Sequence, residues 1–196
     1  MNMPNKLTIS RIVLAFVFMW LLFCRGVQCK VLALVVFVAA SLTDILDGYL
    51  AKRYRMVTDF GKFMDPIADK VLIIAAFLSF VEMRLIPAWT AVFVVLRELI
   101  VTGLRIFALA KGKVISADAG GKQKMVSQVV TIFFTIIFIV LREAGAQALP
   151  FWSPQVESAY RETIFFLMLV TVVFTIISGV SHLIRNRELY FNVKVR

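Results

Sequence analysis

Residues 41–70 read SLTDILDGYLAKRYRMVTDFGKFMDPIADK, and four aspartates in this stretch decide how the chain is interpreted. Asp44 and Asp47 are spaced i, i+3, and Asp65 and Asp69 are spaced i, i+4, so each pair falls on one face of a helix. Apolar runs lie on both sides of a short connection. The sequence therefore predicts two antiparallel helices that bring the four carboxylates together at one end.

Four converging carboxylates require compensating charge. Each aspartate in a membrane helix costs about 2.5–3.5 kcal/mol to insert, and four ionised groups also repel one another. A pair of divalent cations would balance them, and oxygen ligands favour Mg²⁺, with Mn²⁺ or Ca²⁺ as alternatives. Such a metal pair suits phosphoryl transfer, because it can clamp a pyrophosphate and its leaving group. The competing interpretation is that the aspartates cap helices or pair with Arg53, Lys62 or Lys70, and four of them at these spacings favour the metal site.

The composition predicts an all-α membrane protein. Of the 196 residues, 61% are hydrophobic and the mean hydropathy is +0.88, whereas soluble domains are about 45–50% apolar. A transmembrane helix needs about 20 apolar residues. Apolar runs recur along almost the whole chain, which predicts a single integral membrane domain over residues 1–196. The six expected transmembrane helices are about 7–23, 31–52, 64–82, 86–109, 125–141 and 162–184.

The net charge of +10 indicates contact with anionic lipid headgroups and phosphorylated ligands rather than nucleic acid, because no soluble face is available for a basic patch. The loops also differ in charge, and Lys and Arg accumulate in cytoplasmic loops of membrane proteins. One side collects fourteen cations and the other five, so both termini are predicted to be cytoplasmic. The first set is Lys6, Arg11, Lys52, Arg53, Arg55, Lys62, Lys111, Lys113, Lys122, Lys124, Arg185, Arg187, Lys194 and Arg196, and the second is Arg25, Lys30, Arg84, Arg142 and Arg161.

Cys24 and Cys29 lie close together in the first predicted loop. They could pair or bind a metal, but two thiols alone make a poor metal site. We therefore expect neither role.

The aspartate stretch resembles a known family. It matches the CDP-alcohol phosphotransferase signature D-x2-D-G-x2-A-R-x8-G-x3-D-x3-D, with one departure, Lys52 where the family usually has Arg. Lysine keeps the charge but lacks the bidentate guanidinium fork, and Arg53 beside it could substitute. The positions in register are Asp44, Asp47, Gly48, Ala51, Gly61, Asp65 and Asp69.

The resemblance implies roles for these residues. Asp44, Asp47 and Asp65 would be metal ligands, and Asp69 would be both ligand and general base, with two Mg²⁺ (or Mn²⁺) ions the expected cofactors. It also implies six transmembrane helices, a homodimer, and an active site on the cytoplasmic face of a bacterial inner membrane. The CDP donor would be bound by Asp44, Asp47, Gly48, Lys52, Arg53 and Gly61.

Secondary blocks resemble the bacterial members that use glycerol 3-phosphate as acceptor and CDP-diacylglycerol as donor. These blocks are PNKLTISR at the N-terminus, RELIVTGLR at 97–105 and GGKQKM at 120–125, where Met125 replaces a frequent Thr. The acceptor phosphate is expected to contact Arg105, Lys122, Lys124 and Arg185. The alternatives are that the lysines only set topology, and that Arg97 and Glu98 simply offset each other's charge.

Two other functions stay open at this point. The acceptor could instead be serine, inositol phosphate or phosphatidylglycerol. A divalent-cation transporter is a different class, because intramembrane carboxylates also mark ion paths. A transporter, however, predicts acidic residues near mid-membrane on several helices, whereas here they cluster at one helix end.

Overall fold

The computed structural model describes residues 3–54, 59–112, 119–148 and 152–187, and it describes side chains within 9–42, 70–109, 111–112, 121–145 and 152–187. All regular structure in these residues is helical, which confirms the all-α prediction. The six helices are α1 (Met3–Phe23), α2 (Val27–Tyr54), α3 (Asp59–Glu82), α4 (Ala88–Ala110), α5 (Ala119–Ala148) and α6 (Pro154–Arg185).

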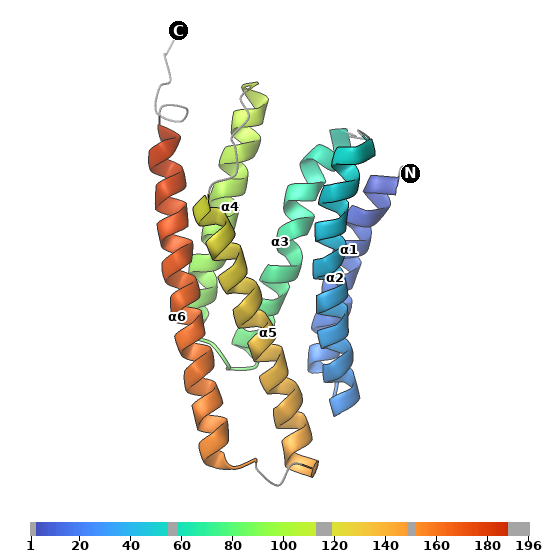
Figure 1. Ribbon diagram of the computed structural model, residues 1–196, viewed down its shortest axis with the longest axis vertical. Coiled ribbons are helices and arrows are strands. Elements are labelled where there is room, and N and C mark those ends of the chain that lie inside the picture. The colour runs from blue at the N-terminus through green and yellow to red at the C-terminus, as the bar shows by residue number, and fades with distance from the viewer. Residues whose placement is uncertain (1–2, 55–58, 113–118, 149–151, 188–196) are drawn as a thin grey trace.

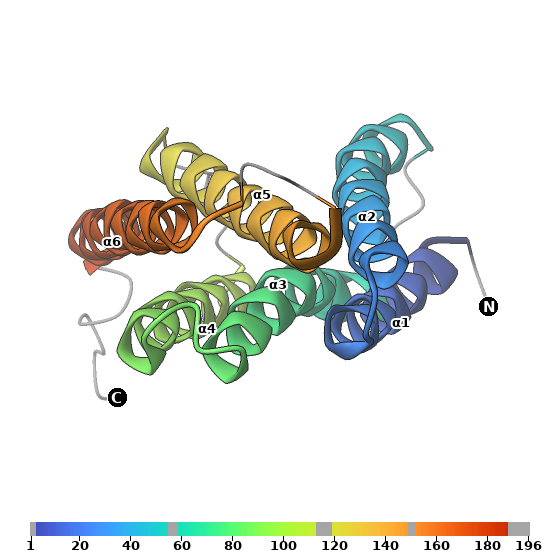
Figure 2. The same cartoon turned by 90° about the horizontal axis from the view of Figure 1, so that it is seen from below.

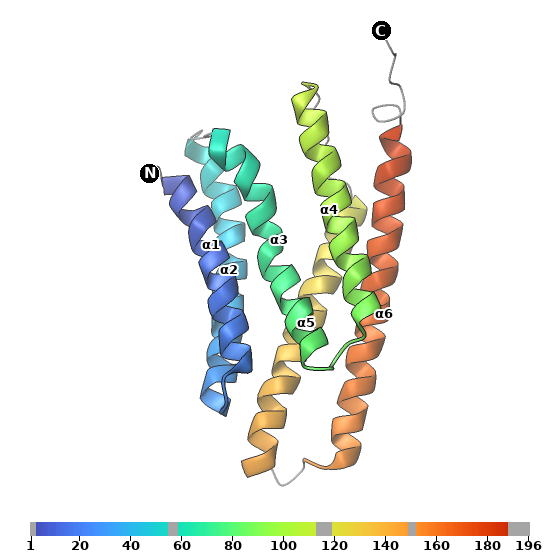
Figure 3. The same ribbon diagram turned by 180° about the vertical axis from the view of Figure 1, so that it is seen from behind.

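The helices form two layers of three. Seen along the bundle, α1, α3 and α4 lie in one layer and α2, α5 and α6 in the other (Figure 2). Contacts join neighbours within each layer and the facing pairs α1–α2, α3–α5 and α4–α6. The start of α1, the end of α2, the start of α3 and the end of α6 all lie toward one end of the bundle (Figures 1 and 3). That end carries the aspartate stretch.

The surface of the bundle is apolar, as expected for a protein in lipid. Phe16, Trp20, Leu99 and Phe166 are each at least 60% exposed. Two segments, Gly121–Gly145 and Pro154–Arg185, are long and apolar enough to cross a membrane, and Ile9–Phe23 and Val27–Leu42 are shorter apolar helices. The number of helices therefore agrees with the prediction, while six membrane crossings stay a prediction.

Two predicted connections are wrong in length. Residues 142–161 were expected to be a loop, but α5 continues to Ala148 and α6 already begins at Pro154. Ser153 caps α6 by accepting a 3.3 Å hydrogen bond from the Val156 amide, and proline at the first helical position suits a helix start. Similarly, α5 begins at Ala119 rather than 125. Polar residues continue these helices beyond their apolar runs, which the apolar pattern does not detect.

The turn between α1 and α2 is fixed by a buried lysine. The Lys30 ammonium donates to the carbonyl oxygens of Leu22 and Cys24, which are among the acceptors left without partners at the end of α1. The Gly26 amide donates to Glu143 Oε1 at 2.9 Å and so ties the turn to α5. Cys24 and Cys29, on either side of this turn, are free thiols.

The turn between α3 and α4 is a Schellman motif with arginine at the left-handed position. Arg84 has φ +55°, and the amides of Arg84 and Leu85 donate to the carbonyl oxygens of Val81 and Phe80, both at 2.9 Å. Phe80 and Leu85 are buried, which supplies the apolar contact of this motif. The turn fixes α3 against α4, the two helices that carry Lys70 and Glu98.

An aromatic cluster closes the opposite end of the bundle, between α5 and α6. The Tyr160 ring lies 5.6 Å from both Phe134 and Phe138 and 5.9 Å from Trp152, centroid to centroid. Gly145 packs under Trp152, and a Cβ placed there would lie 2.5 Å from the indole ring. Only glycine therefore fits this contact without movement.

We expect Gly145→Ala to destabilise the protein by about 1–3 kcal/mol, because the added methyl group must displace Trp152 from the cluster. The matched control is Gly103→Ala in α4, where an added Cβ meets nothing within 4 Å. That change should stabilise by about 0.5–1 kcal/mol through helix propensity. Thermal unfolding in detergent measures both, and equal effects of the two substitutions would contradict the packing argument.

Candidate active site

The backbone places the four aspartates near one junction. Asp44 and Asp47 lie toward the end of α2, and Asp65 and Asp69 lie in the first half of α3. Only residues 55–58 separate the two helices, and both helix ends lie at the same end of the bundle (Figure 1). This agrees with the predicted antiparallel arrangement of the two helices.

The side chains of this motif lie outside the described residues. The same holds for the predicted donor-binding positions Gly48, Lys52, Arg53 and Gly61. Convergence of the carboxylates therefore stays a prediction. Within the described side chains, no group of three or more His, Cys, Asp or Glu could hold a metal ion.

The described residues next to the motif contain a charged network centred on Glu98. Its side chain is 1% exposed although it lies in α4 between Arg97 and the lipid-facing Leu99. The ammonium of Lys124, from α5, pairs with Glu98 Oε1, and Lys124 is itself only 4% exposed. A buried carboxylate without a cation would be strongly destabilising, so this ion pair explains how Glu98 can be buried.

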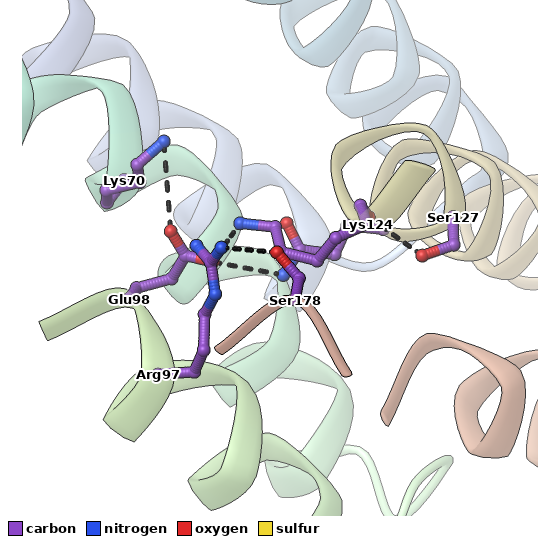
Figure 4. Close-up of polar contacts among 7 residues, drawn as sticks. Lys70, Arg97, Glu98, Lys124, Ser127 and Ser178 are labelled. Carbon is purple, nitrogen blue, oxygen red and sulfur yellow. Dashed lines mark hydrogen bonds and ion pairs between the residues drawn. The ribbon is translucent and has the colours of Figure 1, made fainter. Parts of the chain in front are cut away.

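Three further groups surround the same carboxylate, of which Figure 4 labels Lys70 and Arg97. Lys70 Nζ, from α3, lies 3.8 Å from Glu98 Oε2, and Arg97 Nη1 lies 3.5 Å from Oε1. Gln128 Nε2, one turn beyond Lys124 on α5, donates to Oε1 at 3.4 Å. The contact of Arg97 with Glu98 is compatible with the alternative in which these two residues offset each other's charge, but Lys124 is the closer cation.

Arg97 extends the network to a fourth helix. Its Nη2 donates a 2.7 Å hydrogen bond to Ser178 Oγ on α6 (Figure 4). Gly179 lies beside this arginine, and a Cβ there would meet Arg97 Cγ at 3.2 Å. The network thus joins α3, α4, α5 and α6. Its member on α3, Lys70, is the residue that follows Asp69 in the chain.

The network is neither neutral nor closed. Lys70, Arg97 and Lys124 supply three positive charges, whereas Glu98 supplies one negative charge. Within the described part of the chain, Arg97 Nε and Glu98 Oε2 make no hydrogen bond although both atoms are buried. The excess positive charge and the unused Arg97 Nε–H donor are suited to an anionic ligand, whereas Glu98 Oε2 can only accept a hydrogen bond.

The four predicted acceptor-binding residues differ in their surroundings. Lys124 is buried and ion-paired, whereas Lys122, Arg105 and Arg185 are exposed. Lys122 and Lys124 lie in the first turns of α5, Arg105 lies two turns beyond Arg97 on α4, and Arg185 ends α6. A shared acceptor pocket formed by these four residues stays a prediction.

Sequence reasoning missed Gln128 and Ser178. Gln128 follows Lys124 at i+4, which places both on one helical face and could have indicated it. Ser178 carries no such signal, because only the packing of α6 against α4 brings it to Arg97. A second polar contact, between the hydroxyls of Thr131 and Thr171 at 2.8 Å, joins α5 to α6 beside the network.

Comparison with known proteins identifies the family. The family described as CDP-alcohol phosphatidyltransferase matches residues 1–185. A Bacillus subtilis (strain 168) relative named CDP-diacylglycerol--glycerol-3-phosphate 3-phosphatidyltransferase is 33% identical over 199 residues, covering 95% of this chain and 96% of its own length. A Mycobacterium tuberculosis (strain CDC 1551 / Oshkosh) relative named probable phosphatidylglycerophosphate synthase is 36% identical, covering 94% of this chain and 81% of its own.

A Rickettsia typhi relative, which has the same name as the Bacillus protein, is 40% identical over 111 residues, or 56% of this chain and 62% of its own length. Two of these three matches extend over nearly the whole chain, and they agree with the aspartate signature. The chain belongs to the CDP-alcohol phosphatidyltransferase family.

Proposed function

We propose that this membrane protein transfers the phosphatidyl group from CDP-diacylglycerol to sn-glycerol 3-phosphate, giving phosphatidylglycerol phosphate and CMP. The observation that carries the proposal is the complete aspartate signature, with its two halves on the adjoining ends of α2 and α3. The names of the relatives from Bacillus subtilis and Mycobacterium tuberculosis support this donor and acceptor. They favour glycerol 3-phosphate over the other acceptors and an enzyme over a cation transporter.

The proposal includes the protein's setting. Apolar helices and bacterial relatives support a bacterial inner membrane location. We place both termini and the active site on the cytoplasmic side, because the basic end of the bundle is the end that carries the aspartates. A single domain over residues 1–196 and a homodimer are further parts of the proposal.

The proposed metal site is supported by the chemistry of its donors. Family members generally depend on metal, and Asp44, Asp47, Asp65 and Asp69 offer only carboxylate oxygens, which suit Mg²⁺ or Mn²⁺. Two bound ions would neutralise the pyrophosphate and the charge that develops on the CMP leaving group.

The chain's own residues then have separate roles. Gly48 and Gly61 let backbone approach the CDP donor closely, and Lys52 and Arg53 supply positive charge for its phosphates. Asp69 accepts the proton of the acceptor hydroxyl. The resulting oxygen attacks the phosphorus attached to diacylglycerol, the bond to CMP breaks, and CMP leaves with the bonding electrons. The motif stretch offers no Cys or His for a covalent intermediate, and Ser41 at its edge is its one serine, so direct displacement is the simpler route.

The acceptor phosphate requires cations near Asp69. The network of Lys70, Arg97 and Lys124 around Glu98 brings fixed positive charge to this region. Free serine carries no phosphate for such charge to recognise. Arg105, Lys122 and Arg185 would add exposed cations from the second half of α4, the start of α5 and the end of α6.

The first test compares acceptors. Purified protein is incubated with CDP-diacylglycerol, Mg²⁺ and one labelled acceptor at a time, and CMP release and labelled lipid are measured. We expect the rate of transfer to glycerol 3-phosphate to be at least about tenfold above the rate of transfer to serine. Serine carries no phosphate, so it would leave the buried cations of the site without an anionic partner, which is costly. Preferred incorporation of serine or inositol phosphate would overturn the acceptor assignment. Metal flux into liposomes without CMP release would instead support the transporter.

The second test replaces the proposed base. Asp69→Asn should lower turnover by at least about 10²-fold, because an amide cannot accept the hydroxyl proton, while donor binding stays largely intact. Asp59→Asn is a matched control, because it makes the same chemical change at the start of α3, at a position that the signature leaves variable. Turnover and equilibrium binding of CDP-diacylglycerol are measured for both variants. Full activity of the Asp69 variant would remove this residue as the base.

A further inference from the structure

The buried position of Glu98 raises the question of what its carboxylate does. Among the described residues, Glu98 is the only acidic side chain that forms ion pairs with the three cations Lys70, Arg97 and Lys124. A negative charge would weaken the binding of an anion at this place if it had no other effect. The Glu98 carboxylate therefore must do something at this site besides balancing the charge of the cations.

Geometry supplies that reason. A lysine side chain is long and flexible, and ordering it has an entropic cost. Glu98 receives the Lys124 ammonium on one oxygen, and the same oxygen accepts from Gln128, one turn further along α5. The carboxylate thereby fixes the ammonium of Lys124 relative to α4 and α5.

The remaining contacts keep Glu98 itself in place. Lys70 approaches its second oxygen from α3, and Arg97 is held by Ser178 on α6 (Figure 4). Side chains of α3 and α5 thus reach this carboxylate of α4, and Ser178 adds α6 through Arg97. The contact from α3 comes from Lys70, the residue that follows Asp69. Arg97 Nε and Glu98 Oε2 are buried and make no hydrogen bond in the described part of the chain, so the donor and the acceptor each keep an unused hydrogen-bonding position.

We propose that Glu98 is a positioning residue, which holds the ammonium of Lys124 at a fixed place beside α3 so that the phosphate of an anionic acceptor is bound next to the helix that carries Asp69. This inference rests on the proposed function, since it concerns how that reaction's phosphate-bearing acceptor is held. Glu98 does not touch the reacting atoms, and it acts through Lys124. Its loss should therefore weaken acceptor binding and leave the donor unaffected.

The test is a double-mutant cycle on Glu98→Gln and Lys124→Gln. Each single variant and the double variant should raise KM for glycerol 3-phosphate by about tenfold, the effect of one charge-assisted hydrogen bond. The effects should not add, because the two residues act as one unit. KM for CDP-diacylglycerol should stay within about twofold in all three variants. Glu162→Gln is the matched control, because it makes the same change at an exposed glutamate of α6.

A purely structural role gives a different result. It predicts a lower Tm for Glu98→Gln with an unchanged acceptor KM for the folded fraction, and that outcome would overturn the proposal. If Glu98→Gln does not fold, Glu98→Asp keeps the charge and retracts the carboxylate from Lys124. The folded aspartate variant should raise acceptor KM by about threefold, and an unchanged value would also overturn the proposal.

The two proposals can fail separately. If the wild-type protein transfers nothing to glycerol 3-phosphate but uses another acceptor, the proposed function is wrong. The same cycle measured with that acceptor then decides the role of Glu98. If the wild-type protein uses glycerol 3-phosphate and the cycle is additive, only the positioning role is lost.

Discussion

An ionised side chain inside an apolar helix bundle must find its partner within the protein, because neither lipid nor a packed core solvates it. This constraint governs the half of the molecule that carries the site. Glu98 is buried, and it is accommodated because Lys124, Lys70, Arg97 and Gln128 converge on it. Those contacts fix how α3, α4 and α5 sit beside one another, and Ser178 adds α6 through Arg97.

The same constraint separates the two ends of the bundle. At the end away from the aspartates, aromatic rings around Tyr160 and a lysine that binds carbonyl oxygens close the turns between helices. Near the aspartates, the contacts between helices are ionic and incompletely satisfied. Aromatic packing and the hydrogen bonds of Lys30 close one end, while the other carries an excess of positive charge that can bind ligands. An enzyme that joins a lipid to a phosphorylated alcohol needs both properties in one short chain.

The two kinds of substrate place opposite demands on this architecture. A lipid donor requires apolar surface that is continuous with the membrane, which the exposed Phe, Leu and Val side chains of the helices supply. A phosphorylated acceptor requires positive charge, and this charge must lie inside the bundle rather than on the apolar surface. Leu99 and Glu98 show how one helix meets both demands, since these neighbours on α4 point to lipid and to the charged interior respectively.

The sequence by itself determined the helical class, the six helices, the family and the acidic pairs, because each depends on local spacing or on a motif contained in one stretch of chain. It misjudged the 142–161 connection, because polar residues such as Ser153 and Glu157 cap and extend helices without an apolar signal. Only the tertiary structure decided that Lys124 pairs with Glu98 and that Arg97 reaches Ser178. These contacts join residues 26 and 81 positions apart, and such partners follow from how helices pack rather than from any periodicity along the chain.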